Sequence, residues 1–243
     1  MNKKTTQLLA LKRDLRLVAT KERAETNAWF FKTGKGEYGE GDVFLGVTVP
    51  QSRALAKKYS DLTFADLKKL LDSKIHEERL VALHILVAQY QKGDTATRQN
   101  VYDFYFENLA RVNNWDLVDT SASYIVGAHL FGTLKTPTIL TKLSVSPNLW
   151  ERRVAIIATH YFIRQGDFST TFDISKRLIS DKEDLIHKAV GWMLREVGKR
   201  DLETLEHFLL EKSRYQTMPR TMLRYAIERF PEEKRKKYLL GVV

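Results

Sequence analysis

The feature that most constrains this chain is an internal repeat about 36 residues long. Four valines in helix-like stretches mark it, at spacings of 37, 36 and 36 residues: Val81, Val118, Val154 and Val190. Such a period is typical of stacked helix–turn–helix repeats, in which each helical pair buries its apolar face against its neighbours. The repeat therefore predicts a stack of helices.

Amphipathic helical segments follow one another with short breaks, and strand patterns are scarce. The predicted helices cover residues 4–18, 21–32, 50–59, 63–72, 76–92, 95–110, 115–130, 136–144, 148–165, 168–180, 182–199, 201–213, 218–229 and 231–239. We expect an all-α chain, a right-handed α-solenoid of about six to seven HEAT-like helical pairs with a concave basic face. One domain would span residues 1–243. A compact helical bundle is the alternative, but it requires no repeating period.

Four glycines interrupt the helical pattern within residues 33–42. A phosphate-binding loop is one interpretation, but the segment lacks the Lys-Ser/Thr ending of a Walker motif and no strand precedes it. A flexible connector is favoured. Pro50 suits the first turn of the helix that follows, where its missing N–H costs nothing.

The chain has no cysteine, which excludes disulfides, thiolate metal ligands and cysteine nucleophiles. Its six histidines lack metal-ligand spacing, so we expect no metal. No apolar run approaches about 18 residues, and residues 1–20 mix basic side chains with short leucine pairs. This start predicts a helix and neither a signal peptide nor a membrane span. A reducing cytoplasm is the expected location.

Lysine and arginine number 40 against 30 acidic residues, which gives a formal charge of +10 and a pI near 9.6. A basic excess of this size favours a polyanionic partner such as nucleic acid, because phosphate contacts release counterions. The alternative is a solvated surface with a basic tail. Residues 234–237 hold part of the excess, but the remainder is spread over many helices.

One copy of the repeat differs from the others immediately after its valine. The equivalent residues are Ala82, Asp119, Ala155 and Gly191. Small residues there allow close helix packing, so the carboxylate of Asp119 breaks a local rule, as functional residues often do. Trp115 lies four residues earlier and shares its helical face. Asp116, near the helix start, is explained by the helix dipole, with Asn113 and Asn114 as candidate caps.

Residues 148–155 form a second cluster of interest. Arg153 precedes the aligned valine, and its planar guanidinium suits a phosphate. Arg152 and Glu151 are interpreted as surface ion-pair residues. Trp150 is assigned to the core or to a contact between repeats, because large aromatic side chains mostly serve packing.

A third cluster surrounds Gly191, which costs about 1 kcal/mol in a helix relative to alanine and so indicates close packing. Trp192 follows it and would form a second aromatic wall beside Asp119. Lys188 and Arg195 would supply positive charge nearby.

The stretches Trp-Asp-Leu-Val-Asp at 115–119, Trp-x-x-Arg-x-Ala at 150–155 and Lys-Ala-x-Gly-Trp-x-Leu-Arg-Glu at 188–196 occur in a characteristic order and spacing. In this respect the chain resembles the bacterial alkylpurine DNA glycosylases of the AlkD type, which are built from HEAT-like repeats. The resemblance includes Phe-Leu-Gly-Val at 44–47 with Pro50, and extends from about residue 20 to 230.

The resemblance implies an enzyme of base excision repair that hydrolyses the N-glycosidic bond of cationic alkylated purines, of the 3-alkyladenine or 7-alkylguanine type, in duplex DNA. Asp119 would match the catalytic carboxylate, and Trp115 and Trp192 the aromatic pair that flanks the lesion. Arg153 would match the arginine of the same cleft. We expect Arg153, together with Lys188 and Arg195, to bind DNA. The resemblance further implies a monomer without cofactor and little extrusion of the base.

Two competing functions use the same repeat. A noncatalytic relative would bind branched or damaged DNA, but it would not need an acidic residue facing phosphates. A protein interaction scaffold would use concave aromatic side chains as hot spots, but it would not need the basic charge.

Overall fold

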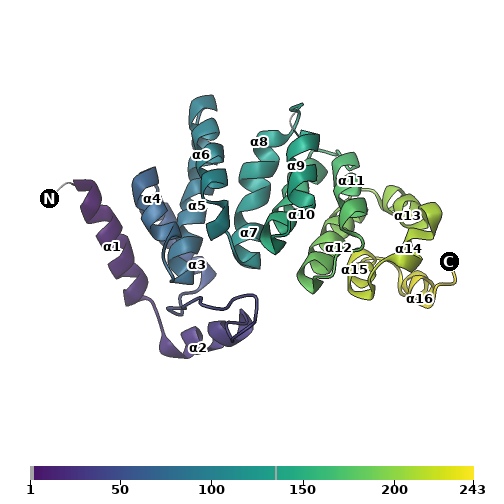
Figure 1. Cartoon of the computed structure of the whole chain (residues 1–243), viewed down its shortest axis with the longest axis horizontal. Helices are drawn as coiled ribbons and strands as arrows, with labels where there is room; N and C mark the ends of the chain where they lie inside the picture. The colour runs from purple at the N-terminus through teal and green to yellow at the C-terminus, as the bar shows by residue number, and fades with distance from the viewer. Residues whose placement is uncertain (1–2, 135) are drawn as a thin grey trace. The chain divides into compact units, whose positions relative to one another are not determined.

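The computed structural model describes residues 3–134 and 136–243, which form helices joined by mostly short connections and by one long connection, residues 31–48, between α2 and α3 (Figure 1). The α-helices are α1 (Lys3–Leu17), α2 (Lys21–Phe30), α3 (Val49–Lys58), α4 (Phe64–Leu71), α5 (His76–Lys92), α6 (Thr95–Glu107), α7 (Trp115–Ala122), α8 (Ala128–Leu130), α9 (Thr136–Ser144), α10 (Leu149–Arg164), α11 (Ser169–Leu178), α12 (Asp184–Gly198), α13 (Leu202–Leu210), α14 (Arg214–Thr217), α15 (Arg220–Ala226) and α16 (Glu232–Leu240). Short helices η1 (Leu109–Arg111), η2 (Ser123–Gly127) and η3 (Glu211–Ser213) complete the list. The predicted all-α class is confirmed.

The chain divides into two compact units, residues 1–121 and 122–243. In the first unit, α1 packs on α3 and α3 on α5, while α4 and α6 cover α5. In the second unit, α10 lies between η2 and α12, and α12 packs on α15. Helices α9, α11 and α13 form the other layer of this unit. Each unit thus repeats one two-layer arrangement in which helices contact their sequence neighbours, as in HEAT-like repeats. The concave basic face and the single domain remain predictions.

The repeat valines are buried to the same extent in all four copies. None of them has measurable solvent exposure: Val81, Val118, Val154 and Val190. The close packing predicted at Gly191 is confirmed, because a Cβ there would lie 2.5 Å from the Met222 carbonyl oxygen of α15. The small residue therefore sets the distance between α12 and α15.

Helix boundaries follow local capping chemistry. Thr48 and Gln51 form a reciprocal capping box at the start of α3, and Pro50 lies in its first turn as predicted. The side chains of Thr63, Asp94 and Asp201 accept a backbone N–H at the starts of α4, α6 and α13. These caps explain why most predicted ends agree with the structure to within a few residues.

The helix predicted over 115–130 is not continuous. It begins as α7, widens into the π-helix η2 and ends as α8. A Cβ on Gly127 would lie 2.2 Å from the Ala158 carbonyl oxygen, so the widened turn lies where the backbone approaches α10 closely. The helix predicted over 201–213 also ends early, at Leu210, because Lys212 and Ser213 adopt positive φ angles. The following short helix α14 was not predicted.

The predicted connector at 33–42 lacks helix and consists of hydrogen-bonded turns. Gly34 N–H donates to the Glu37 carboxylate over 2.9 Å, and Gly36 N–H donates to the Glu40 carboxylate over 2.8 Å. Gly36 and Gly41 have positive φ angles, which glycine adopts without strain.

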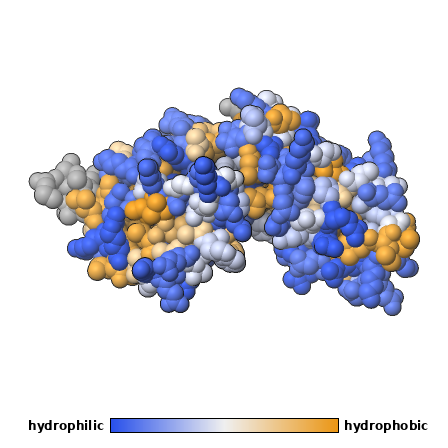
Figure 2. Space-filling model, turned by 60° about the horizontal axis from the view of Figure 1, so that its bottom comes forward, coloured by the Kyte–Doolittle hydropathy of each residue, from blue (hydrophilic) through white to orange (hydrophobic). Residues whose placement is uncertain are grey.

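Across the described ranges, none of the helices combines the length and the apolar character that a membrane span requires. Figure 2 shows a mainly hydrophilic surface interrupted by apolar patches. In the first unit, the exposed large apolar side chains include Leu17, Trp29 and Phe30.

Candidate functional site

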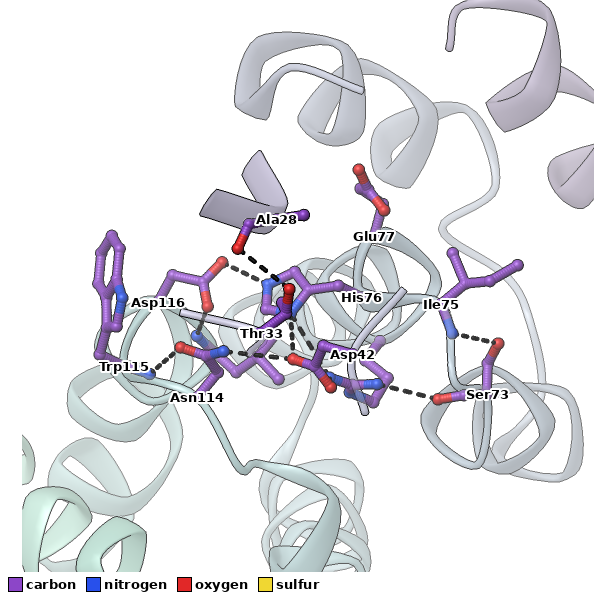
Figure 3. Close-up of polar contacts among 12 residues, drawn as sticks. Ala28, Thr33, Asp42, Ser73, Ile75, His76, Glu77, Asn114, Trp115 and Asp116 are labelled. Atoms are coloured by element: carbon purple, nitrogen blue, oxygen red, sulfur yellow. Dashed lines mark hydrogen bonds and ion pairs between the residues drawn. The ribbon is translucent and has the colours of Figure 1, made fainter. Parts of the chain in front are cut away.

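The start of α7 is fixed by the side chain of Asn114, which is fully buried. Its Oδ1 accepts the Trp115 backbone N–H over 2.8 Å, and its Nδ2 donates to Asp42 Oδ2 over 3.2 Å (Figure 3). The residue predicted as a candidate cap therefore also links α7 to the connector that precedes α3.

Trp115 is half-buried against aromatic rings from the last residue of α2 and from the segment that follows it. Its indole stacks on Phe31 with a centroid separation of 5.0 Å and an interplanar angle of 8°. Phe30 meets the indole edge-on at 5.9 Å, and Phe31 also stacks on Phe44 at 4.9 Å. We call Phe31, Phe44 and Trp115 the aromatic stack. It fixes the plane of the indole and covers one of its faces.

A buried histidine lies beside this stack and joins two carboxylates (Figure 3). His76 Nδ1 is 3.0 Å from Asp42 Oδ2, and His76 Nε2 is 2.7 Å from Asp116 Oδ2. Arg79 Nη2 donates to the other Asp42 oxygen over 2.6 Å. The histidine side chain is only 2% exposed. We call Asp42, His76 and Asp116 the carboxylate bridge.

The carboxylate bridge holds charge in a buried place. Burial lowers the pKa of His76, but the charge of Asp116 and the hydrogen bonds to Asp116 and Asp42 outweigh it and raise the pKa to about 9. Burial raises the pKa of Asp42, but His76 and Arg79 more than compensate and bring it below its ordinary value. His76 is therefore an imidazolium and Asp42 a carboxylate at neutral pH.

Asp119 lies one helical turn after Trp115 and is half-buried. Burial raises the pKa of Tyr105 on α6, and the Asp119 charge adds to the increase although a hydrogen bond to Ser121 opposes it. The Tyr105 hydroxyl is 3.0 Å from Ser121 Oγ. The carboxylate thus acts electrostatically on the interior beside α6 while part of its residue stays accessible.

The other predicted site residues belong to the second unit. Arg153 on α10 is only 5% exposed, and its Nη1 donates to the Leu185 carbonyl oxygen over 2.5 Å. It therefore reaches the first turn of α12. Trp192 is half-buried, and its indole N–H donates to Glu196 over 3.0 Å.

Two predicted cationic side chains also project from α12. Lys188 pairs with Asp184 at 2.7 Å, and Arg195 pairs with Glu228. Their spacings of four and three residues from Trp192 place all three side chains on one side of the helix. Each cation therefore has an acidic neighbour within its own unit.

Sequence reasoning missed the carboxylate bridge. The helix dipole alone does not account for Asp116, because its Oδ2 lies at hydrogen-bonding distance from His76. No short-range spacing indicated the connection, since His76 is 34 residues from Asp42 and 40 from Asp116. In the sequence, the three residues of the carboxylate bridge are marked only by their ionisable side chains.

A cavity of about 280 Å³ lies next to the aromatic stack within the first unit. Its lining residues are Arg23, Asn27, Phe31, Phe44, Val47, Thr48, Val49, Pro50, His76, Glu77, Leu80 and Asp116. Among the residues that the structure describes, no group of three or more His, Cys, Asp or Glu side chains is arranged to hold a metal ion.

Comparison with known proteins identifies the family. The family model described as DNA alkylation repair enzyme matches residues 11–230. A solved structure of a predicted DNA alkylation repair enzyme from Enterococcus faecalis has a TM-score of 0.67 and 19% sequence identity, covering 88% of this chain and 97% of that one. No curated protein matches significantly. The solved structure supports the predicted HEAT-like fold, and the family match confirms the resemblance noted in the sequence: the chain belongs to the DNA alkylation repair enzyme family.

Proposed function

We propose that the protein is a DNA glycosylase that hydrolyses the N-glycosidic bond of cationic alkylated purines in duplex DNA. The observation that carries the proposal is the half-buried carboxylate of Asp119, which follows Trp115 by one turn in a chain of the DNA alkylation repair enzyme family. The three equivalent repeat positions hold small buried residues instead. The close packing that favours small residues in the other copies therefore does not account for a carboxylate here.

The proposed reaction needs a carboxylate that stabilises positive charge, but it does not need a general acid that protonates the leaving base. An alkylated purine is already cationic and leaves readily, so the barrier lies in the positive charge that develops on the deoxyribose. A carboxylate at about 4 Å contributes on the order of 4 kcal/mol at an effective dielectric near 20. In the proposed mechanism, ionised Asp119 stabilises this oxocarbenium-like sugar and orients the attacking water.

Trp115 offers a π surface to a cationic sugar or base. Such cation–π attraction is worth roughly 0.5 to 2 kcal/mol, depending on desolvation. Its contact with Phe31 supports this role, because a ring held in one orientation loses little conformational freedom on binding.

The second unit would contribute contacts to the DNA duplex. Lys188 and Arg195 would bind phosphates of the DNA backbone. Each would do so by leaving its present ion pair, with Asp184 and Glu228 respectively. Trp192 would flank the lesion nucleotide. Arg153 would contact phosphate only after its buried side chain rearranges, since it now donates to the Leu185 carbonyl.

The decisive experiment measures release of methylated purine from alkylated duplex DNA by the wild type and by Asp119→Asn. We expect a loss of at least about 100-fold in the excision rate with DNA affinity retained, because the substitution removes charge but preserves shape. Asp173→Asn is the matched control, since Asp173 is an exposed carboxylate on α11.

Equal excision by the wild type and Asp119→Asn would refute the assigned role of the carboxylate. A wild-type protein that binds alkylated duplex without releasing base would instead identify a noncatalytic relative.

A further inference from the structure

We propose that His76 is a positioning residue of the candidate active site: as an imidazolium between Asp42 and Asp116, it fixes the start of α7 and the orientation of Trp115. This inference rests on the proposed function, because it gives His76 a part in presenting Trp115 and Asp119 to DNA. His76 itself is buried and would not touch the substrate.

The hydrogen bonds of the carboxylate bridge require a doubly protonated ring. Ionised carboxylates only accept hydrogen bonds, and a neutral imidazole carries a single N–H. Both ring nitrogens of His76 nevertheless face carboxylate oxygens, at 3.0 Å from Asp42 and 2.7 Å from Asp116. Only the imidazolium donates to both, so loss of its proton breaks one side of the bridge.

The charges around the imidazolium come from three segments. The connector supplies Asp42, α7 supplies Asp116, and α5 supplies Arg79, whose Nη2 lies 3.5 Å from His76 Nδ1. Arg79 opposes the histidine charge, but it also neutralises Asp42 through a 2.6 Å contact. Two carboxylates and two cations therefore balance, and this balance permits the burial of a charged histidine.

Residues 43–47, which directly follow the connector, are attached to the start of α5 and to the residues just before it. Val43 N–H donates to the Lys74 carbonyl over 3.0 Å, and His76 N–H donates to the Val43 carbonyl over 2.9 Å. The buried Glu77 carboxylate accepts three further backbone N–H groups, from residues 45, 46 and 47. Asp42, residues 43–47 and α5 thus form one platform, because Asp42 is also bound to Arg79 of α5.

Two side chains at the start of α7 reach this platform. Asn114 donates to Asp42, and Asp116 accepts from His76. The imidazole also packs on the aromatic stack, 4.6 Å from Phe44 and 5.0 Å from Phe31 between ring centroids. The ring of Phe31 also stacks on the indole of Trp115. The protonation state of His76 is therefore coupled to the orientation of Trp115 by packing as well as by hydrogen bonds.

The first test follows Trp115 in the protein without DNA. The indole N–H resonance of Trp115, assigned with Trp115→Phe, is recorded from about pH 6 to about pH 10.5 beside the imidazole resonance of His76. We expect both signals to titrate together near the histidine pKa of about 9. In His76→Gln the indole signal should not titrate over this range. An indole signal insensitive to pH in the wild type would overturn the positioning role.

The second test measures excision by His76→Gln beside His84→Gln. His84 lies on the same helix as His76. Burial, and to a smaller extent the charge of Arg53, lowers the pKa of His84 to about 4, so its imidazole is neutral at the assay pH. We expect His76→Gln to lower the single-turnover excision rate at least tenfold without changing DNA affinity, and His84→Gln to have little effect. A rate unchanged in a folded His76→Gln protein, or an equal loss in both variants, would overturn the proposal.

A pH profile, taken under conditions in which circular dichroism shows both proteins fully folded, tests whether excision depends on the proton of His76. The ratio of the wild-type rate to the His76→Gln rate, taken on one DNA preparation, should fall towards one as pH rises through about 9, because the wild type then loses its imidazolium. A ratio constant with pH would contradict the inference. Absence of excision by the wild type would refute the proposed glycosylase, whereas the indole titration tests the coupling on the free protein in either case.

Discussion

Asp119 differs from its repeat counterparts in burial as well as in charge. Ala82 and Ala155 have no measurable exposure and Gly191 is buried, whereas Asp119 is half-buried. Full burial would make an ionised carboxylate costly, and full exposure would screen its field with water. The intermediate position suits the role proposed for Asp119, in which a carboxylate acts on a cationic sugar.

Gly191 allows a direct test of the packing that the repeat imposes. Gly191→Ala should destabilise the protein by about 1 to 3 kcal/mol, because the added methyl overlaps backbone of α15 and outweighs the gain in helix propensity. The melting temperature should fall by several degrees.

Gly34→Ala is the matched control, since its Cβ would meet only the flexible Glu37 side chain. Equal melting temperatures for the Gly191 and Gly34 variants would show that α12 and α15 separate freely.

At the scale of elements, the carboxylate bridge joins the connector, α5 and α7. This arrangement makes the stability of the first unit depend on pH. The folded state raises the pKa of His76 from 6.5 to about 9, so its contribution is fully present below pH 6.5 and is lost as pH rises through about 9. This increase in the His76 pKa corresponds to about 3 kcal/mol of folding free energy, at about 1.4 kcal/mol per pKa unit. The value belongs to the carboxylate bridge as a whole and is not added again for its aspartates.

Chemical denaturation of the wild type and His76→Gln should therefore give free energies of unfolding that differ most near pH 6 and converge above about pH 9. The lowered pKa of Asp42 has the opposite dependence, because its contribution is lost as pH falls below the ordinary aspartate range. A difference between the two proteins that grows from neutral pH to pH 10 would contradict a charged His76.

At the scale of the whole molecule, the basic excess predicts salt-sensitive DNA binding. A chain with a formal charge of +10 should lose affinity steeply as salt rises, since each neutralised phosphate contributes about −0.9 to the slope of log K against log salt. Lys188→Ala should make this slope shallower by about 0.9 if its ammonium meets a phosphate.

Lys176→Ala serves as the control, because Lys176 is an exposed lysine of α11 that pairs with an aspartate as Lys188 does. Identical slopes for the two variants would remove Lys188 from the proposed DNA contacts.

Much of the architecture was predictable because its determinants are local. The helix over 76–92 begins and ends as predicted, and Pro50 and Gly191 have the positions that their chemistry indicated. The widened turn at 123–127 was not predictable, since it depends on a backbone contact with α10. The candidate site also has a predictable and an unpredictable part. Helical spacing places Trp115 and Asp119 on one face, but the burial of Arg153 does not follow from its sequence neighbours.

The sequence alone determined the repeat, the all-α class and the anomalous carboxylate of Asp119, because helical periodicity, caps and small residues act within a few turns of the chain. Only the tertiary structure decided that Asp42, His76 and Asp116 meet. Their charges attract strongly only after packing has removed water from around them, and residues separated by 34 and 40 positions come together only through that packing.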